Sequence, residues 1–419
     1  MNIENFNYKK LYTDVPKAKN RFKKTLTEFQ KHFGQIIDYN KPLSVISAPG
    51  RTEIGGNHTD HQHGCVLAAA INLDVLTFAI PNNSNTINLY SDGFGISKIN
   101  LNNLKPANDK NDTQALIKGI ATYFVKKGYK IGGFNAYLTS NVIVGSGLSS
   151  SAAFEIAVGG VLNFLFNKNS ISPIELAIAG QFAENNFMNK ASGLMDQTAS
   201  AVGGFVSIDF KNPTKPIIKP IQYDLTKADY ALCVVDVNAS HANLTTAYSQ
   251  IPREMKMVAN YFKKDVLRDV NEKKFWDNIA KIRLKTGDRP VLRAIHFFGE
   301  NQRALNEAKL LENNNLDEFL LEVRASGNSS YKYLQNIYAD INQQAVSLAL
   351  AASEKILYEN NRQKTAVRVH GGGFAGTILA FVPQDLLEIY KTKIEKILGA
   401  KSCHILQIRN TGYWAQWLN

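Results

Sequence analysis

The alternation of hydrophobic and polar positions along the chain predicts an irregular succession of helices and strands. Residues 16–38 carry hydrophobic side chains at helical spacing among charged ones, so we expect an amphipathic helix there. Hydrophobic runs at 43–49 and 65–81 predict strands, the first of which ends at a loop. Residues 152–166 are apolar on all sides and predict a helix buried on nearly every face, with a second helix over 172–188.

A proline-rich segment at 210–223 predicts extended backbone and a connection between domains. We therefore expect an N-terminal lobe over 1–212 and a C-terminal lobe over 213–419. The second part opens with a strand-like run at 230–237, continues with long helical patterns and closes on strand-like pieces near 365–382. Because strands and helices alternate irregularly, the pattern predicts an α+β fold.

Composition and charge narrow the class of protein. A chain of 419 residues exceeds the usual size of one hydrophobic core, and 44% hydrophobic with 20% charged residues is typical of a soluble globular protein. The formal charge of +12 raises the possibilities of a nucleic-acid partner, a membrane surface or an anionic substrate. Lysine and arginine are scattered and form no stripe interleaved with aromatic residues, so we expect no nucleic-acid partner.

Cysteine usage and hydropathy bear on the compartment. Cys65, Cys233 and Cys403 are odd in number and far apart, which fits a reducing cytoplasm. The N-terminal residues have no signal-peptide pattern, and no uninterrupted apolar run is long enough for a membrane span. We expect a cytoplasmic protein with no membrane partner, either a monomer or a weak homo-oligomer.

The segment GRTEIGGNHTDHQHG, residues 50–64, crowds an arginine, two acids, three histidines and four glycines into fifteen positions. A metal site, a phosphate cradle and a sugar pocket would all use these residue types. The spacing of His58, His61 and His63 could hold a transition metal, although the H-E-x-x-H signature of zinc hydrolases is absent.

The segment VGSGLSSSAAFEIA, residues 144–157, leads from a predicted strand into the buried helix. Free backbone N–H groups and the positive helix end would converge there, which is typical of a phosphate site. It is neither a Walker A loop nor a dinucleotide fingerprint. A serine-rich helix cap explains the same residues equally well.

Two further segments carry candidate groups. Glu184 and Asp196 stand twelve residues apart, and phosphoryl transfer needs one carboxylate for Mg²⁺ and one that orients or deprotonates the attacking hydroxyl. The glycine-rich RVHGGGFAGTILAF, residues 368–381, permits close approach of backbone to a ligand, or makes a plain tight turn.

Together and in order, these segments resemble a known family. APGRTEIGGNHTDHQHG resembles the galactokinase signature, and VGSGLSSSAA followed by GGGFAG resembles the second and third motifs of the GHMP kinase superfamily. AENNFMNKASGLMDQ and VDVNASHANLTTAYSQIPRE are similar to the family's next segments. The resemblance implies a two-lobed GHMP-kinase-like fold with mixed sheets packed by helices and the active site between the lobes. It also implies ATP and Mg²⁺ as co-substrates and phosphorylation of a sugar, first of all galactose, at its anomeric hydroxyl.

The same resemblance implies roles for individual residues. Asp196 would accept or orient the proton of the attacking hydroxyl, beside Arg51. The sugar would be bound by Glu53, Asn57, His58, Asp60, Gly193 and Tyr248. The triphosphate would lie on Gly145, Ser146, Gly147, Leu148, Ser149, Ser150 and Ser151, and Mg²⁺ on Ser151 or Ser150 with Glu184.

Three positions depart from the galactokinase pattern, namely Glu53, Asn57 and His61. Glu53 could supply from four residues away the carboxylate that the family carries at position 57. Alternatively, the sugar differs, because galacturonokinases are similar in the run HTDHQ and in a neutral residue before the histidine. A third alternative is a sugar sensor without catalysis, although Arg51, Asp196 and the phosphate loop are all present.

Overall fold

The structure is a computed structural model that describes residues 3–36, 42–106, 112–143, 145–190, 192–237, 244–361, 364–374 and 376–418. Its α-helices are α1 (Val15–Phe33), α2 (Asp112–Lys126), α3 (Ser150–Phe166), α4 (Pro173–Phe187), α5 (Met195–Val202), α6 (Thr245–Tyr261), α7 (Glu272–Thr286), α8 (Asp288–Glu312), α9 (Leu316–Ser329), α10 (Ala345–Asn361) and α11 (Leu387–Leu398). Short helices are η1 (Ile3–Asn5), η2 (Tyr8–Lys10), η3 (Gly34–Ile36), η4 (Asp60–Gln62), η5 (Leu267–Asp269), the π-helical η6 (Ser330–Leu334) and η8 (Gln384–Leu386).

The strands form two sheets. They are β1 (Leu43–Gly55), β2 (Cys65–Pro81), β3 (Thr86–Ser91), β4 (Gly95–Asn100), β5 (Phe134–Ser140), β6 (Phe205–Asp209), β7 (Ile217–Ile221), β8 (Tyr230–Asp236), β9 (Ala366–His370), β10 (Thr377–Pro383), β11 (Cys403–Leu406) and β12 (Trp414–Leu418). The larger, eight-stranded sheet has the order β12-β1-β2-β5-β3-β4, and β6 pairs with both β2 and β7. The smaller sheet has the order β11-β8-β10-β9.

Strand β1 carries the start of the glycine- and histidine-rich segment. The sequence predicted that the strand ends near residue 49, but it continues to Gly55 and all of its residues are buried. It is paired on both sides, with β12 and β2, and irregularities interrupt the register with β2 between Pro49 and Arg51 and between Glu53 and Gly55. The expected loop is therefore a strand whose two bulges re-aim Arg51 and Glu53.

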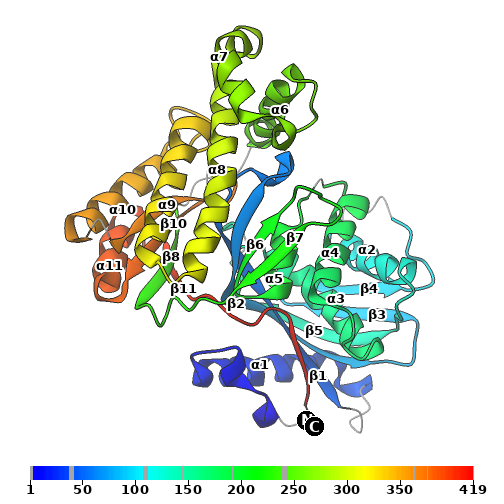
Figure 1. Cartoon of the computed structure of the whole chain (residues 1–419). Helices are drawn as coiled ribbons and strands as arrows, with labels where there is room; N and C mark the ends of the chain where they lie inside the picture. The colour runs from blue at the N-terminus through cyan, green and yellow to red at the C-terminus, as the bar shows by residue number, and fades with distance from the viewer. Residues whose placement is uncertain are drawn as a thin grey trace.

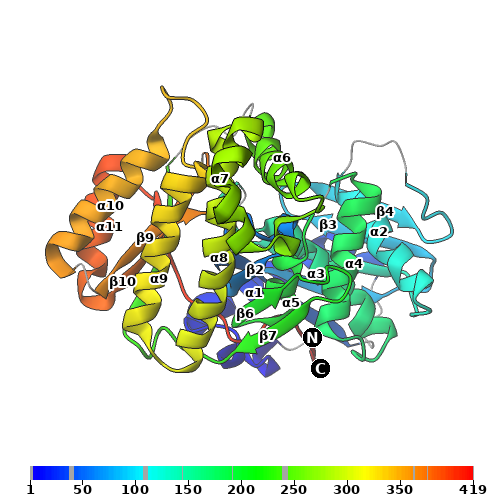
Figure 2. The same ribbon diagram turned by 45° about the horizontal axis from the view of Figure 1, so that its top comes forward.

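Helices cover the sheets in layers (Figure 1). The larger sheet packs α1 on one face and α2, α3 and α5 on the other, with α4 outside these three helices. The smaller sheet packs α10 and α11 on one face, while its other face joins α9 in the main hydrophobic core. Figure 2 shows α8 and α9 running side by side between the two sheets. Mixed sheets packed by helices confirm the predicted α+β fold.

The predicted lobe boundary near residue 212 stays a prediction. Two strands on its C-terminal side, β7 and β12, hydrogen-bond into the larger sheet. Most other predicted elements are confirmed, including the amphipathic helix at 16–38, the strand over 65–81 and the buried helix α3. In α3 the burial extends even to Glu155.

Candidate active site

A loop between β1 and β2, residues 56–64, is folded tightly on itself. Gly56 has a positive φ of 86°, and a Cβ there would meet the Cys65 carbonyl oxygen at 2.4 Å. The Thr59 hydroxyl donates to the Gly56 and Cys65 carbonyls. The loop therefore presents its polar side chains from a fixed backbone.

These side chains line a cavity of about 180 Å³ between β1, the 56–64 loop and the β9–β10 hairpin loop. Its lining residues are Arg51, Glu53, Gly56, Asn57, His58, Asp60, Val66, Met195, Gly371 and Gly372. The cavity is smaller than the roughly 300–1,000 Å³ of pockets for drug-sized ligands, so its size suits a small polar molecule. We call it the sugar cavity below, because the sequence predicts that its residues bind the sugar.

Glu53 and Asn57 form one wall of the sugar cavity and contact each other. Asn57 Nδ2 donates to Glu53 Oε1 and to the Gly371 carbonyl, both at 2.7 Å, while Asn57 Oδ1 accepts from Asn336 Nδ2 at 2.8 Å. Arg368 Nη2 lies 3.2 Å from Glu53 Oε1. Burial raises the pKa of Glu53 to about 7, although the charge of Arg368 opposes the shift. Among the described residues, Glu53 Oε2 has no hydrogen-bond partner and is left for a ligand.

His58 and Asp60 project from the 56–64 loop into the same space. Burial lowers the pKa of His58, and its neutral ring donates Nε2–H to the Gly372 carbonyl at 2.9 Å. Nδ1 is then an acceptor, and no described residue hydrogen-bonds to it. Asp60 faces Gly193, where a Cβ would come within 2.7 Å of Asp60 Oδ2. A glycine at 193 therefore permits this approach.

Arg51 lines the sugar cavity, and Asp196, which follows the lining residue Met195, contacts Arg51. Arg51 Nε and Nη2 each lie 2.8 Å from Asp196 Oδ1, and the Ser149 hydroxyl donates to Asp196 Oδ2. Arg51 Nη1 also donates to the Gly147 carbonyl. Arg51 is buried, whereas a third of the Asp196 side chain is exposed. The carboxylate is therefore fixed in place and still reachable.

The loop before α3 places backbone amides beside this pair. Gly145, Gly147 and Ser149 have positive φ values of 80°, 69° and 55°, alternating with other residues. Such alternation makes a concave nest of N–H groups. Ser149 is the N-cap residue of α3, but its side chain bonds Asp196 and caps no helical amide, which contradicts the simple helix-cap alternative. Ser150 and Ser151 open the first turn of α3.

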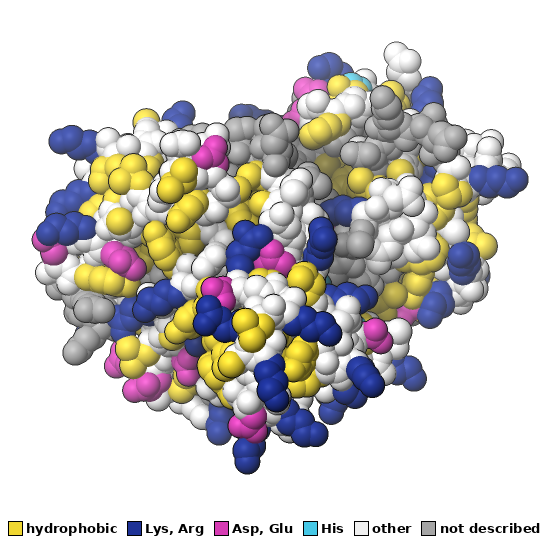
Figure 3. Space-filling model, turned by 90° about the horizontal axis from the view of Figure 1, so that it is seen from above, with side chains coloured by type: hydrophobic (Ala, Val, Ile, Leu, Met, Phe, Trp, Pro, Cys, Tyr) yellow, Lys and Arg dark blue, Asp and Glu magenta, His cyan; other side chains and the backbone are white. Residues whose placement is uncertain are grey.

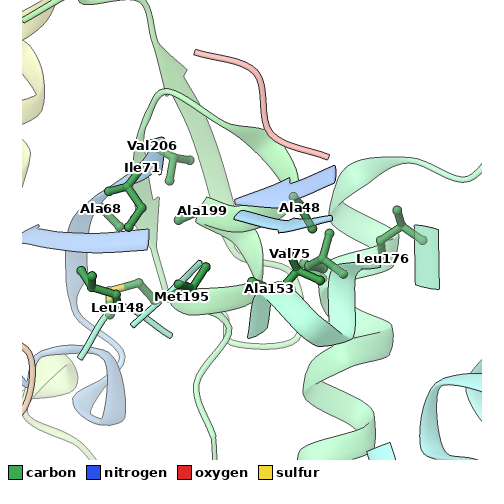
Figure 4. Packing of buried hydrophobic residues seen from close by; sticks show 14 of the residues in the cluster. Ala48, Ala68, Ile71, Val75, Leu148, Ala153, Leu176, Met195, Ala199 and Val206 are labelled. Carbon is green, nitrogen blue, oxygen red and sulfur yellow. The ribbon is translucent and has the colours of Figure 1, made fainter. Parts of the chain in front are cut away.

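Buried hydrophobic residues fix the loop before α3 and the Asp196 carboxylate relative to each other. Leu148 is fully buried, and Met195 precedes Asp196 at the start of α5. Figure 4 shows Leu148 beside Met195 in the core, with Ala199 of α5 above them and Ala153 of α3 next to Val75. The Ser146 hydroxyl is turned away from the nest, because it donates to the Ile143 carbonyl at 2.8 Å.

A buried chain of hydrogen bonds joins the two ends of the site. His370 Nε2 lies 3.1 Å from the Thr52 hydroxyl and its Nδ1 2.9 Å from the Thr377 hydroxyl, which donates to the Ser146 carbonyl. Burial lowers the pKa of His370 well below its usual range, and nearby Arg51 adds to the effect. A neutral His370 therefore ties β1, the β9–β10 hairpin and the phosphate loop together.

Glu184 lies on α4 beside a second carboxylate that the sequence did not single out. Glu184 is ion-paired with Lys190, and Gln197 Nε2 donates both to Glu184 Oε2 at 3.2 Å and to Glu155 Oε2 at 2.9 Å. Glu155 Oε1 is buried without a partner, and burial followed by the charge of Glu184 raises the pKa of Glu155 well above its usual range. Ser151 stands one helical turn before Glu155 on α3, so these oxygens share one region.

Tyr248 lies on α6 against the glycine-rich hairpin loop. Its hydroxyl donates to the Gly373 carbonyl at 2.8 Å, and a Cβ at Gly372 would meet its ring at 2.6 Å. Tyr248 is absent from the lining of the sugar cavity. In the described structure it therefore supports the loop that contacts His58 and Asn57.

Other interpretations of the sequence receive no support from this geometry. His61 has both ring nitrogens buried without partners, and burial lowers its pKa to about 4. The described residues contain no group of three or more side chains suited to hold a metal ion. In the part of the chain that is described, no helix combines the length and apolarity needed to cross a bilayer. On the face shown in Figure 3, lysine and arginine are spread among acidic and hydrophobic side chains.

Comparison with known proteins agrees with the site. Residues 115–204 match the family described as GHMP kinases N terminal domain, and residues 27–81 match the galactokinase galactose-binding signature. The chain belongs to the GHMP kinase superfamily. A galactokinase of Glaesserella parasuis is 29% identical over 379 residues, covering 88% of this chain and 91% of its own. A galactokinase of Limosilactobacillus reuteri is 29% identical, covering 85% and 90%.

Solved structures of the superfamily share the fold. The Lactococcus lactis galactokinase complexed with galactose has a TM-score of 0.76 at 24% identity, covering 93% of this chain and 99% of its own. The mevalonate kinase of Methanococcus jannaschii has a TM-score of 0.59 at 14% identity, covering 90% and 98%. With galactokinases as relatives along most of its length, this GHMP kinase is a sugar kinase, a transferase that uses ATP.

Several residues that shape the site were not predicted from the sequence. Arg368, Asn336 and His370 act from behind the cavity walls, and each is far in sequence from the residues that it contacts. Arg368 and His370 lie in the glycine-rich segment 368–381, to which the sequence assigned no side-chain role, and Glu155 left a signal as the single charged residue within the apolar run 152–166.

Proposed function

We propose that this kinase phosphorylates the anomeric hydroxyl of galactose with ATP, releasing galactose 1-phosphate and ADP. The observation that carries the proposal is the position of Arg51. Its side chain lines the sugar cavity, holds Asp196 through two nitrogens and donates to Gly147 of the phosphate loop. One residue thus joins the sugar, the candidate base and the phosphate loop.

The proposed chemistry assigns Asp196 to the attacking hydroxyl. With Oδ1 held by Arg51 and Oδ2 by Ser149, the carboxylate is oriented to accept the proton as the anomeric oxygen bonds to the γ-phosphorus. Arg51 favours the ionised carboxylate and offers positive charge to the transferring phosphoryl group. The amides of Gly145–Ser151 would hold the phosphates. Positioning and charge stabilisation are most of what phosphoryl transfer requires.

The residues near Glu184 suit Mg²⁺. Carboxylate and hydroxyl oxygens are the donors that Mg²⁺ prefers, and Glu155 Oε1 is buried without a partner. We propose that Glu184 and Ser151 hold the ion together with ATP, with Glu155 beside them, and that Lys190 then leaves Glu184. Bound there, Mg²⁺ would neutralise charge on the phosphates. Ser150 is the alternative hydroxyl.

Neutral galactose fits the sugar cavity better than galacturonate. Among the described lining residues the acidic ones are Glu53 and Asp60, and Arg51 is the single cation, already held by Asp196. Arg368 lies behind Glu53 and spends its charge on that carboxylate. At about 4 Å, two like charges near a protein surface repel by roughly 4 kcal/mol. This repulsion supports a sugar without a carboxylate. It also supports the alternative in which Glu53 supplies the carboxylate that the family carries at position 57.

The test is an ADP-release assay with galactose, galacturonate, N-acetylgalactosamine and arabinose side by side. We expect the highest kcat/KM with galactose. A higher kcat/KM with galacturonate would identify galacturonate as the substrate instead of galactose. Binding of sugar and ATP without ADP release for any of the four sugars would instead establish a sensor, and the intact Arg51–Asp196–Ser149 contacts argue against that outcome.

We also propose a cellular location, a class of partner and an oligomeric state for the enzyme. A cytoplasmic location is supported by the three buried cysteines, which are all unpaired. A small sugar is the expected partner, without nucleic acid or membrane, and the protein is expected to be a monomer or a weak homo-oligomer.

A further inference from the structure

A second cavity of about 560 Å³ lies on the far side of the glycine-rich hairpin loop. It is walled by α6, the first turns of α8, the π-helical η6 and the segment after it. Gly371 and Gly372 of the hairpin loop line the sugar cavity, whereas Phe374 of the same loop lines the second cavity. The two cavities thus share one loop.

The second cavity holds an excess of positive charge. Arg289 and Arg293 both bind the single carboxylate of Glu254, Arg289 through Nε at 3.0 and 3.1 Å and Arg293 through Nη1 at 2.9 Å. Lys332 adds a third cation to the lining. With Glu254 counted, the net charge of these groups is +2.

Each arginine keeps one terminal nitrogen for a ligand. Arg293 is only 1% exposed. Its Nε donates to the Leu334 carbonyl and its Nη1 donates to Glu254. Arg289 spends Nε and Nη2 on Glu254 and Gln250. Arg293 Nη2 and Arg289 Nη1 have no hydrogen-bond partner among the described residues, and both residues line the cavity.

Arg293 shares its one carboxylate partner with Arg289. Burial lowers the pKa of Arg293 to about 10, and the neighbouring charge of Arg289 adds to this effect, while Glu254 opposes it. A buried cation that shares its counter-ion with a second cation is stabilised by any further negative charge.

We propose that the second cavity binds a phosphate monoester of a small sugar. Two guanidinium groups and an ammonium group match the geometry and charge of a dianionic phosphate. The rings of Tyr331, Tyr338 and Phe374 offer apolar surface to the carbon skeleton. The sugar cavity, by contrast, is lined with carboxylates and does not suit this ligand.

Occupancy of the second cavity is coupled to the sugar cavity through Asn336. Asn336 lies between the lining residues Gln335 and Ile337, and its carbonyl accepts from the Phe374 amide. Its side chain donates to Asn57 Oδ1 at 2.8 Å and to the Gly372 carbonyl at 3.1 Å. A ligand that orders this segment therefore pre-orders the wall of the sugar cavity and lowers the KM for sugar.

The test counts bound phosphate by isothermal titration calorimetry, with inorganic phosphate as the probe. We expect the wild-type protein to bind one more phosphate per chain than the Arg289→Met/Lys332→Met variant. Lys309→Met removes an exposed charge from α8 outside the cavity and should match the wild type. Equal stoichiometry and affinity in wild type and double variant would overturn the site. Phosphate bound by the active-site loop is common to all three proteins and cancels.

Two further measurements complete the test. Phosphate should lower the galactose KM of the wild type about fivefold and leave that of the double variant unchanged, and galactose should tighten phosphate binding by the same factor. An unchanged KM would overturn the coupling. This second readout rests on the proposed function, whereas the calorimetric one does not.

If the double variant fails to fold, Arg289→Lys replaces it. This variant keeps the charge, loses the planar fork of the guanidinium group and should weaken phosphate binding about tenfold. Unchanged phosphate binding would count against the site.

Discussion

In the sugar cavity Glu53, Asn57 and His58 are hydrogen-bonded by neighbouring protein groups, whereas at the phosphate end Glu155 and Glu184 are incompletely paired. Both amide protons and the side-chain oxygen of Asn57 are hydrogen-bonded to protein atoms, and one oxygen of Glu53 accepts from Asn57. At the other end, Glu155 has an orphaned oxygen and Glu184 is paired with the half-exposed Lys190.

This difference indicates how the two substrates are received. The sugar meets a rigid wall with a few open acceptors, so its recognition needs little rearrangement. On the proposed function, Mg²⁺ and the nucleotide would contact the region of Glu155 and Glu184, where one buried carboxylate oxygen has no protein partner among the described residues. Substitutions at the phosphate end should therefore lower the reaction rate. Substitutions in the cavity wall should instead lower the stability of the protein or raise the sugar KM.

The largest effect is expected where the two regions meet. Asp196→Asn keeps the shape of the side chain but loses the ability to accept the proton, so kcat should fall about 10³–10⁴-fold. Calorimetric binding of ATP should stay within about threefold of wild type, because the phosphate loop is intact. A kcat within tenfold of wild type would refute the role of Asp196.

Arg368→Met tests whether the cavity wall depends on its buried ion pair. The change leaves Glu53 without its cation and removes the donor to the Ile54 carbonyl. The free energy of unfolding, measured with urea, should fall by about 3–5 kcal/mol. Arg283→Met breaks an exposed pair with Asp288 and should cost under about 1 kcal/mol. Equal losses in the two variants would show that the wall is not held in this way.

The protonation of Glu53 gives the wall a pH dependence. Its pKa in the folded protein is raised to about 7 from 4.5, so the stability that it contributes is full below pH 4.5 and is lost as the pH rises through 7. Between pH 4.5 and 8 the wild type should lose about 3 kcal/mol of unfolding free energy relative to Glu53→Gln. Urea unfolding of both proteins across this range measures it, and a constant difference would contradict the assignment.

A smaller and selective effect is expected at the phosphate end. Glu184→Gln removes a negative oxygen from the proposed Mg²⁺ site, so the Mg²⁺ concentration for half-maximal rate should rise about 10–100-fold. The galactose KM should change less than twofold, because Glu184 is remote from the sugar cavity lining. A parallel rise in both quantities would mean that the two ends are not independent.

Much of the fold was predictable from periodicity, because buried strands and helices leave long hydrophobic runs. The strand at 65–81 and the buried helix near 152–166 are of this kind. The extent of β1 was not, since glycine, arginine and glutamate at 50–55 are typical of a loop. Those residues remain in a strand because they pair with β2, whereas β12 pairs only with residues 43–47, and the two bulges accommodate the polar side chains.

The candidate site was partly predictable for a similar reason. Arg51, Asp196 and Ser149 lie in segments whose order resembles a family, and the structure brings the three together. Asn336 could not be found, and Arg368 was included only as part of the glycine-rich segment 368–381, because the roles of both depend on contacts across more than 270 residues of sequence. Tyr248 contacts the hairpin loop beside the cavity, and its role in sugar binding stays a prediction.

The pairing of β12 with β1 has a consequence for how the enzyme is made. The strand that carries Arg51 and Glu53 has Trp414–Leu418 as its second neighbour, and Gln416 also bonds the backbone near Asn5. During synthesis the ribosome adds about 5–20 residues per second, so β1 waits tens of seconds for this partner. For that time a nascent chain exposes the unpaired edge of β1, and we expect this edge to need protection from other chains until Trp414–Leu418 emerge.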